Sequence, residues 1–426
     1  LVEDDRVQTV VLTGGTSTAR HMLANRPRLH LIAETGGKNA TIVTALSDRD
    51  LAIKHVIYSA FGHGGQKCSA TSLLLLEDEV YEDAGFRETL ADAVRSLHVG
   101  SVWDLSTSVG PLIRPPSGDL ARGMKELEPG ESWLVMPERV SGNPNLYRPG
   151  VKWNVKPGSF THRTELFGPV LGVMRYRRLE DAIGIVNATG YGLTSGLESL
   201  DEREQEIWQE TIRAGNLYIN RPTPGAIVLR QPFGGVGSSA YGPGVKAGGP
   251  HYIIPLMNLT DSPDRPALDD GTSPGYGDAD SSTADELTRF RSALHDLAAA
   301  GQLSQDAVAT LDAAIASQRR AVATEFAGEH DTVGILGQDN LRRYRPVRQM
   351  RIRLHPSDSL LDMLLSISAA IAARAFVTVS HGVELQDEVV EVLDAIVDCL
   401  PGRVEILEQS DDELAAASRA GYVDRL

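Results

Sequence analysis

Cys68 follows a run of glycines in residues 61–70, which read FGHGGQKCSA. Glycines before a cysteine let the backbone turn sharply and approach a ligand closely. Such a loop can present a thiolate nucleophile and offer backbone N–H groups to an oxyanion that develops on the substrate. The alternative is a buried and unreactive cysteine, which is the commoner state of a lone thiol. The residues of this segment alone leave both interpretations open.

Two carboxylates also stand beside glycines. Glu34 ends a predicted strand and precedes Gly36 and Gly37, so it can take a proton from a thiol or activate a water. The alternative is a solvated glutamate at a strand end. Glu165 opens the segment ELFGP, which is either a turn closed by Gly-Pro or a carboxylate that holds a ribose hydroxyl, with Phe167 beside a nicotinamide.

Two further features carry less chemistry. Residues 231–239, QPFGGVGSS, form a glycine-rich loop that is flexible by composition and can cover a substrate. His63, His98 and His162 lack the spacing of metal ligands, so we expect no metal site and treat them as surface or packing residues.

The elements that position these residues alternate between strands and helices over residues 1 to about 258. Strands are predicted at 10–12, 29–33, 72–76 and 215–219, and a helix at 16–25 follows Gly14 and Gly15. This alternation predicts an α/β fold with a mostly parallel sheet covered by helices.

An acidic segment then interrupts the chain. Residues 261–284, DSPDRPALDDGTSPGYGDADSSTA, contain six Asp and one Arg among several Pro, Gly and Ser. This composition cannot bury a core, and we predict a linker over residues 259–284.

Residues 285–426 form a second predicted α/β domain. Ser304 caps a helix whose apolar face uses Val308, Leu311, Ile315 and Val322. Strands at 347–354, 376–380 and 404–407 alternate with helices at 360–373, 389–400 and 413–420, which is a Rossmann-like order. The turn at 381–384, HGVE, lacks a glycine fingerprint, so we expect no working dinucleotide site there. Cys399 ends a predicted helix, and we expect it to be structural.

The composition excludes several classes of protein. The chain has 426 residues, two cysteines and a net charge of −16, which argues against non-specific binding to nucleic acid or to an acidic membrane surface. Two distant cysteines give no disulfide framework, and no apolar stretch is long enough to span a bilayer, so we expect a cytoplasmic location. The first residues form no signal peptide and lack a start Met, and we expect the sequence to be a fragment of a larger protein.

The order of the motifs is more specific than any one of them. The segments LTGGT at 12–16, ETGGKN at 34–39, GQKC at 65–68, ELFGP at 165–169 and QPFGG at 231–235 together resemble the aldehyde dehydrogenase superfamily. The resemblance covers residues 1–258. It implies residues 1–32 as the C-terminal remnant of the NAD-binding domain and residues 33–258 as the catalytic domain with its return segment.

The resemblance also implies site residues and a mechanism. Cys68 is the nucleophile that forms a thiohemiacetal and then a thioester, and Glu34 activates the water that releases the acid. Residues near the NAD cofactor are implied at Thr13, Gly14, Gly15, Thr16, Gly36, Glu165 and Phe167. The choice between NAD and NADP stays open.

A finer resemblance concerns the substrate. Residues 221–235, RPTPGAIVLRQPFGG, and 246–250, KAGGP, look like the L-glutamate γ-semialdehyde dehydrogenase branch, although Pro224 stands where Thr is expected. The branch implies that the loop at Gly225 and Ala226 binds the amino-acid end of the substrate through backbone N–H groups, and that Ser69 and Phe233 line the pocket. The implied reaction is the NAD-dependent oxidation of L-glutamate γ-semialdehyde to L-glutamate, the second step of proline catabolism.

The C-terminal domain resembles the third domain of long proline utilisation A proteins, through residues 337–348, GQDNLRRYRPVR, and the strand that follows. That resemblance implies an aldehyde-dehydrogenase-like fold without catalysis, truncated here, that helps cover a channel. It also implies a homo-oligomer and an upstream proline dehydrogenase domain that holds FAD. We expect the arginines to be solvated or salt-bridged rather than bound to nucleic acid. We also expect the isolated chain to bind NAD poorly and turn over little, because the first Rossmann strands of the family lie before residue 1.

Three alternatives remain at this point. The enzyme can oxidise another aldehyde, although the segments around Gly225 and Lys246 argue against that. The chain can be a non-catalytic scaffold or lid module that works through residues 285–426. It can also be a thioester hydrolase that needs only Cys68 and Glu34.

Overall fold

The computed structural model describes residues 2–140, 142–260, 281–355, 357–382 and 385–426. The chain divides into two compact units, Leu1–Asn258 and Leu259–Leu426. Both units are α/β, so the predicted fold class is confirmed. Residues 261–280 of the predicted linker lie outside the described residues.

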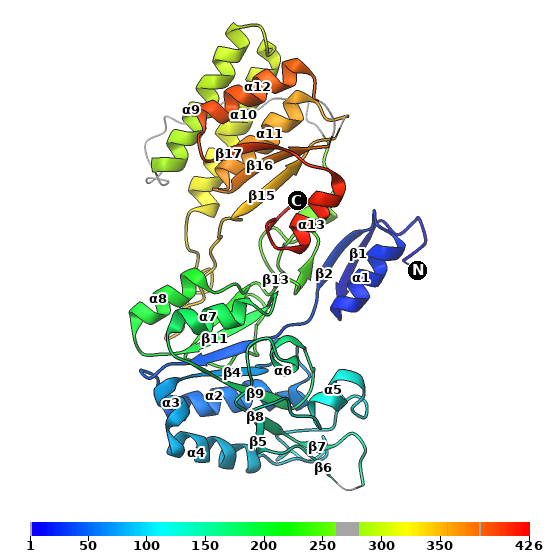
Figure 1. The fold of residues 1–426 in the computed structure, drawn as a ribbon, viewed down its shortest axis with the longest axis vertical. Coiled ribbons are helices and arrows are strands. Elements are labelled where there is room, and N and C mark those ends of the chain that lie inside the picture. The colour runs from blue at the N-terminus through cyan, green and yellow to red at the C-terminus, as the bar shows by residue number, and fades with distance from the viewer. Residues whose placement is uncertain (1, 141, 261–280, 356, 383–384) are drawn as a thin grey trace. The chain divides into compact units, whose positions relative to one another are not determined.

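The first unit begins with a small sheet in the order β1-β2-β14. Figure 1 shows β1 and β2 beside α1 near the N-terminus. Strand β1 (Thr9–Thr13), helix α1 (Thr16–Asn25) and strand β2 (His30–Glu34) confirm the three elements predicted there. Strands β1 and β2 are parallel and end side by side, with Thr13 opposite Glu34. Strand β14 (Ala240–Tyr241) returns from far along the chain and pairs with β2 antiparallel.

The main sheet of the first unit has seven strands in the order β12-β11-β3-β4-β9-β8-β5. Neighbouring strands are parallel except β5, which runs antiparallel to β8. Their bounds are β3 (Ala40–Val43), β4 (Leu73–Glu77), β5 (Ser132–Val135), β8 (Gly150–Trp153), β9 (Val170–Tyr176), β11 (Thr194–Glu198) and β12 (Asn216–Ile219). Two ribbons complete the strands, β6 (Glu138–Arg139) with β7 (Tyr147–Arg148) and β10 (Tyr191–Gly192) with β13 (Val236–Gly237). The predictions at 72–76 and 215–219 correspond to β4 and β12 and are confirmed.

Helices cover both faces of this sheet, as the alternation along β4 requires. Leu74 and Leu76 pack in the apolar cluster of α2 and α4, whereas Leu73 and Leu75 pack in the cluster of α7 and α8. The helices of this part are α2 (Arg49–Phe61), α3 (Asp78–Glu82), α4 (Ala84–Arg95), α5 (Gly118–Gly123), α6 (Phe160–Arg163), α7 (Leu179–Asn187) and α8 (Glu202–Thr211). Short 3-10 turns stand at Gly62–Gly65 and Ile254–Leu256.

The second unit is built on the parallel sheet β15-β16-β17, with helices α9 to α12 gathered on one side of it (Figure 1). Its strands are β15 (Gln349–Arg353), β16 (Phe376–His381) and β17 (Val404–Glu408). Its helices are α9 (Ser281–Ala299), α10 (Gln305–Ala321), α11 (Leu360–Ala372), α12 (Asp387–Cys399) and α13 (Asp411–Arg419), with a π-helical turn at Val322–Phe326. The predicted cap is confirmed, since Ser304 Oγ accepts the N–H of Ala307. Val308, Leu311 and Ile315 are buried, while Val322 packs against the core from the π turn.

Helix α9 corrects the sequence prediction in this unit. The linker was expected to run to residue 284, yet α9 begins at Ser281. Leu287, Phe290, Leu294 and Leu297 recur at helical spacing and are all buried, so tertiary packing holds this helix in place. None of the helices in the described part of the chain is long and apolar enough to cross a membrane.

The arginine-rich segment of the second unit is salt-bridged, as expected. Arg342 pairs with Glu325 at 2.5 Å, and Arg343 lies 3.6 Å from Glu329. Of the turn predicted to lack a dinucleotide site, Val383 and Glu384 lie outside the described residues. Gly382, just after β16, lies so close to Arg353 that an added Cβ would stand 2.3 Å from its guanidinium.

Candidate active site

The turn that carries Cys68 leads from the end of α2 to the start of β4. His63, Gly64 and Gly65 have φ values of 55°, 63° and 69°, in the left-handed region that favours glycine. A Cβ on Gly65 would lie 2.4 Å from the carbonyl oxygen of Gly168, so no larger residue fits there. The glycines predicted to shape this turn therefore do so by conformation and by close approach.

Two side chains hold the carbonyl groups that follow the thiol. Asn39 Nδ2 donates to the Cys68 oxygen at 2.6 Å and to the Ala70 oxygen at 3.0 Å. Thr223 Oγ1 donates to the Ser69 oxygen at 2.9 Å. Because the C=O and N–H of a trans peptide point in opposite directions, the Asn39 contact turns the Ser69 N–H toward the side of the sulfur.

The Cys68 thiol lies between opposing influences on its pKa. Burial raises the pKa, the backbone N–H groups of Ser69 and of Cys68 itself lower it, and the nearby carboxylates of Glu165 and Glu34 raise it further. The structure therefore brings the predicted nucleophile and two of the predicted carboxylates within electrostatic reach of one another.

Glu34 ends β2 with a largely buried carboxyl group. Its Oε2 accepts the N–H of Gly235 at 2.9 Å. Burial raises the pKa of Glu34 to about 7, against smaller lowering effects of that N–H and of Lys246. Lys246 in turn donates to the Gly215 oxygen at 2.5 Å, and burial lowers its pKa to about 8. A carboxyl group with a pKa near 7 suits a general base at neutral pH.

Glu165 reaches into the strand-end segment 36–38. Its Oε1 accepts the Gly37 N–H at 2.9 Å, and a Cβ on Gly36 would lie 1.8 Å from its Oε2. Burial raises the pKa of Glu165, although the Gly37 N–H and Lys38 oppose the shift. Lys38 is 2% exposed, its ammonium has no hydrogen-bond partner among the described residues, and burial lowers its pKa to about 7. Gly36 is thus required for the approach of Glu165.

A cavity of about 580 Å³ opens at the start of α1 and is lined by Thr16, Ser17, Arg20, His21, Ala24, Tyr191 and Ser238. Thr13 ends β1 and is followed by Gly14. Gly15 is the N-cap residue of α1 and has no side chain that could cap the helix. The Thr16 hydroxyl donates to the Ser238 oxygen at 3.3 Å. A helix start left open in this way can receive the pyrophosphate of a dinucleotide, so the residues present fit the expected cofactor.

The remaining predicted residues lie on two loops. Phe167 has a φ of 50° and is 39% exposed, two residues after Glu165. Phe233 pairs through its backbone with Ala247, at 2.9 Å and 3.0 Å. Gly225 is exposed with a φ of 126°, and Ala226 beside it is half-buried.

Sequence reasoning assigned no role to four residues that the structure places at the site. Asn39 and Thr223 hold the turn that carries Cys68, Lys246 lies near Glu34, and Tyr191 lines the cavity at Thr16. Asn39, Thr223 and Lys246 lie inside recognised segments, yet their roles arise only from partners far away in sequence. Tyr191 had no signal in its local sequence.

Comparison with known proteins identifies the family of this chain. The family model described as "Aldehyde dehydrogenase family" matches residues 1–260. The chain belongs to this family. Among curated relatives, the 1-pyrroline-5-carboxylate dehydrogenase of Bacillus subtilis is 34% identical over 265 residues, which cover 60% of this chain and 50% of the relative. The bifunctional protein PutA of Escherichia coli is 36% identical over 282 residues, which cover 60% of this chain and 20% of PutA.

Solved structures extend the likeness of this aldehyde dehydrogenase chain. Proline utilization A from Corynebacterium freiburgense gives a TM-score of 0.74 at 35% identity, covering 96% of this chain and 40% of that one. A 1-pyrroline-5-carboxylate dehydrogenase from Thermus with bound NAD gives 0.56 at 32% identity, covering 61% and 51%. The chain thus spans about half the length of the dehydrogenases it matches, and its second unit is included in the match to proline utilization A.

Proposed function

We propose that this chain carries the catalytic half of an NAD-dependent L-glutamate γ-semialdehyde dehydrogenase. The observation that carries the proposal is the buried Glu34 carboxyl group, whose pKa is about 7, within electrostatic reach of Cys68 on its glycine turn. The names of the relatives support the substrate, because 1-pyrroline-5-carboxylate opens by hydrolysis to glutamate γ-semialdehyde.

Cys68 performs the first covalent step in this proposal. Its thiolate adds to the aldehyde carbon and forms a thiohemiacetal, while the backbone N–H of Cys68 donates to the new oxyanion. The hydrogen bonds from Asn39 to the carbonyl groups of Cys68 and Ala70 keep the turn in one conformation during this step. NAD, when bound, supplies the hydride acceptor that converts the thiohemiacetal to a thioester.

Glu34 performs the second step. Its carboxylate takes a proton from a water molecule, the water oxygen adds to the thioester carbon, and the carbon–sulfur bond breaks to give the carboxylic acid and the Cys68 thiolate. A pKa of about 7 leaves roughly half of the Glu34 side chains ionised at neutral pH, when they can accept that proton. The Gly235 N–H at 2.9 Å holds the carboxyl group between turnovers.

The cofactor residues follow from the same geometry. Thr13, Gly14, Gly15 and Thr16 would hold the pyrophosphate at the open start of α1. Glu165, whose approach requires a glycine at position 36, would accept a hydrogen bond from a hydroxyl of the nicotinamide ribose. Phe167 would pack beside the nicotinamide. NADP remains an alternative cofactor under this proposal.

The substrate residues are proposed at the other side of the thiol. The N–H groups of Gly225 and Ala226 would bind the substrate carboxylate, since backbone amides supply donors without a titrating charge. The φ of 126° at Gly225 gives this loop a conformation that an L side chain rarely adopts. Ser69 and Phe233 would line the pocket between that loop and the thiol.

The wider organisation is proposed by analogy with the relatives. Residues 1–32 would complete the NAD-binding domain, 33–258 would form the catalytic domain, and 285–426 would be a non-catalytic cover beyond the linker at 259–284. We further propose a cytoplasmic homo-oligomer with an upstream, FAD-dependent proline dehydrogenase domain, as the likeness to the bifunctional PutA proteins suggests.

The decisive experiment uses the complete natural protein that contains this sequence. With L-glutamate γ-semialdehyde and NAD⁺, we expect NADH formation by absorbance, and we expect Cys68→Ala to abolish it. Activity with simple aldehydes alone would discard the substrate and keep the reaction class. A complete lack of activity with every aldehyde would contradict the proposal.

A further inference from the structure

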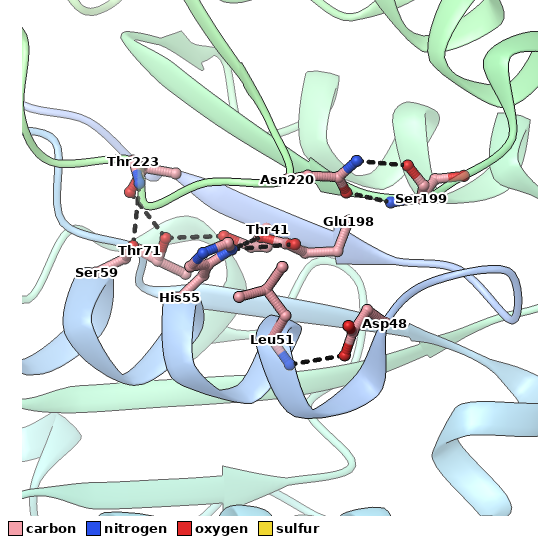
Figure 2. Close-up of polar contacts among 10 residues, drawn as sticks. All are labelled: Thr41, Asp48, Leu51, His55, Ser59, Thr71, Glu198, Ser199, Asn220 and Thr223. Atoms are coloured by element: carbon pink, nitrogen blue, oxygen red, sulfur yellow. Dashed lines mark hydrogen bonds and ion pairs between the residues drawn. The ribbon is translucent and has the colours of Figure 1, made fainter. Parts of the chain in front are cut away.

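Three buried hydroxyl groups form a chain that leads into the main sheet from the turn that carries Cys68, called the nucleophile turn (Figure 2). Thr223 Oγ1 and Thr71 Oγ1 are 3.0 Å apart, and Thr71 Oγ1 and Thr41 Oγ1 are 2.9 Å apart. The three residues are 1%, 1% and 2% exposed. This hydroxyl chain joins the loop after β12, the start of β4 and the middle of β3, and the mechanism above uses none of its members.

Thr223 is the member that touches two functional loops. Its hydroxyl donates to the Ser69 oxygen, one residue after the nucleophile, and its own N–H donates to Ser59 Oγ on α2 at 3.0 Å. Its backbone continues directly into Pro224, Gly225 and Ala226, the proposed carboxylate-binding loop. One residue therefore ties the loop for one end of the substrate to the turn for the other end.

The base of the same loop is fixed a few residues earlier. Asn220 Oδ1 accepts the Ser199 N–H at 3.0 Å, and Asn220 Nδ2 donates to the Ser199 oxygen at 2.8 Å (Figure 2). Asn220 itself has a φ of 51°, which turns the chain out of β12. The loop thus leaves the sheet from a defined point, and Thr223 is the next buried contact along it.

Gly196 on β11 leaves the room that Thr223 needs. A Cβ added at Gly196 would lie 3.1 Å from Thr223 Cγ2 and 3.1 Å from Thr41 Oγ1. A side chain at position 196 would therefore press on Thr223 and Thr41, so glycine there lets both side chains keep their positions in the hydroxyl chain.

We propose that Thr223 is a positioning residue that fixes the spacing between the nucleophile turn and the carboxylate-binding loop, so that the enzyme selects its substrate by length. This inference rests on the proposed function. A substrate held at its carboxylate and attacked at its aldehyde must match that spacing, and a misplacement of about 1 Å costs on the order of 100-fold in rate. An aldehyde without a carboxylate is held at one end only and does not depend on the spacing.

The test compares two substrates in matched variants of the complete natural protein. Thr223→Val removes the hydroxyl with almost no change in shape, and Thr41→Val removes a hydroxyl of the same chain that touches neither loop. For Thr223→Val we expect kcat/KM to fall about 10- to 100-fold with L-glutamate γ-semialdehyde and less than about threefold with propanal. For Thr41→Val we expect the ratio of the two kcat/KM values to stay at its wild-type value, and Thr223→Ser should restore most of that ratio.

Each other outcome counts against the inference. Equal losses with both substrates in Thr223→Val, or the same change of ratio in Thr41→Val, would show that the hydroxyl only stabilises the fold. A wild-type enzyme that oxidises propanal but not L-glutamate γ-semialdehyde would overturn the proposed substrate and the inference together. If Thr223→Val gives no folded protein, Gly196→Ala provides the second test, because its added methyl presses on Thr223 and Thr41 while both hydroxyls remain, and Thr41→Val reports the effect of Thr41 alone. An unchanged substrate ratio in Gly196→Ala would overturn the inference.

Discussion

The two units differ in whether burial raises the pKa of any carboxyl group. Among the described residues such groups lie in the first unit, which also has Asp residues with lowered pKa values, such as Asp83 and Asp201. In the first unit, burial raises the pKa of Glu34 to about 7 and of Glu198 to about 8, and it raises the pKa of Glu165 as well. In the described part of the second unit, the perturbed carboxyl groups shift downward. Hydrogen bonds from Tyr344 and Arg342 lower the pKa of Glu325 to about 2, and backbone N–H groups lower the pKa of Asp331.

The direction of each pKa shift decides whether the group adds to the stability of the fold or lowers it. A carboxyl group whose folded pKa is raised costs stability above its unfolded pKa, because the fold disfavours the charged form. A carboxyl group whose folded pKa is lowered adds stability over the same range. The first unit therefore keeps Glu34, Glu165 and Glu198 at an energetic cost, which both catalytic and structural sites can do, whereas Glu325 and Asp331 stabilise loops of the second unit.

The largest expected effect tests whether a raised pKa is enough to mark a catalytic acid. Glu34→Gln removes the base for thioester hydrolysis, so we expect steady-state turnover to fall about 10²- to 10⁴-fold. The first NADH burst should remain, because Cys68 still forms the thioester. Rapid mixing of the complete natural protein with substrate and NAD⁺ measures both phases.

Glu198→Gln is the matched control for that experiment. Glu198 is also buried, with a pKa raised to about 8, but it pairs with His55 at 3.0 Å (Figure 2). Glutamine resembles its protonated form, so turnover should stay within about threefold of wild type. Equal losses in the two variants would mean that Glu34 acts through the fold.

The two cysteines offer the next comparison. Burial raises the pKa of Cys399 to about 11, and its sulfur donates to the Ile396 oxygen at 3.2 Å. Burial also raises the pKa of Cys68, but two backbone N–H groups stabilise its thiolate. We expect iodoacetamide at pH 8 to label Cys68 roughly 10- to 100-fold faster than Cys399, as measured by peptide mass spectrometry. If Cys399 is labelled faster than Cys68, the proposed role of Cys68 as the reactive thiol is wrong.

The pH dependence of hydrolysis gives a smaller and sharper effect. Glu34 works as a base only when ionised, so the thioester hydrolysis rate should rise as pH passes its pKa of about 7. Between pH 6 and pH 8 the ionised fraction, and with it the rate, should increase about tenfold. Single-turnover measurements check this, and a rate that falls over that range would exclude Glu34 as the base.

The smallest effect belongs to the second unit. Glu325 accepts hydrogen bonds from Arg342 and Tyr344, both at 2.5 Å, and its side chain is 25% exposed. Glu325→Gln should lower the free energy of unfolding of this unit by about 1–2 kcal/mol in urea titrations at pH 7. The loss should shrink as pH falls from about 4.5 toward 2, because wild-type Glu325 is then protonated as well.

Glu329→Gln serves as the control for Glu325. Glu329 lies 3.6 Å from Arg343 and is 51% exposed, so its removal should cost no more than about 0.5 kcal/mol. If both variants lose the same stability, the lowered pKa of Glu325 does not report a specific contribution to the fold.

The sequence predicted the strands and helices well where an apolar period was strong. Strand β4 and helix α10 appear where the spacing of leucines and valines placed them. Helix α9 was missed because its first turn lies in the polar end of an Asp-rich segment, and its buried face depends on partners elsewhere in the unit. The spacing of apolar residues alone does not show whether a segment packs against the rest of the unit.

The candidate site also contains some residues that local motifs predicted and others that they could not. Cys68, Glu34 and Glu165 were identified from local motifs, and the structure places the two carboxylates where they influence the thiol. The hydrogen bonds of Asn39 and Thr223 could not be predicted, because their partners lie far away in the sequence. Asn39 and Cys68 are 29 positions apart, and Thr223 and Ser69 are 154 positions apart. The raised pKa of Glu34 could not be predicted from the sequence either, because it depends on how deeply the folded chain buries the carboxyl group.

The return of β14 to β2 bears on how this chain is made. Glu34 gains its Gly235 partner from 201 residues further along, and β14 closes the edge of the sheet that carries it. During synthesis at the ribosome, the β1-β2 edge therefore stays open until the segment around Tyr241 has emerged. The nascent chain passes through a long interval in which Glu34 is exposed to water and the edge of β2 is free to pair with another chain.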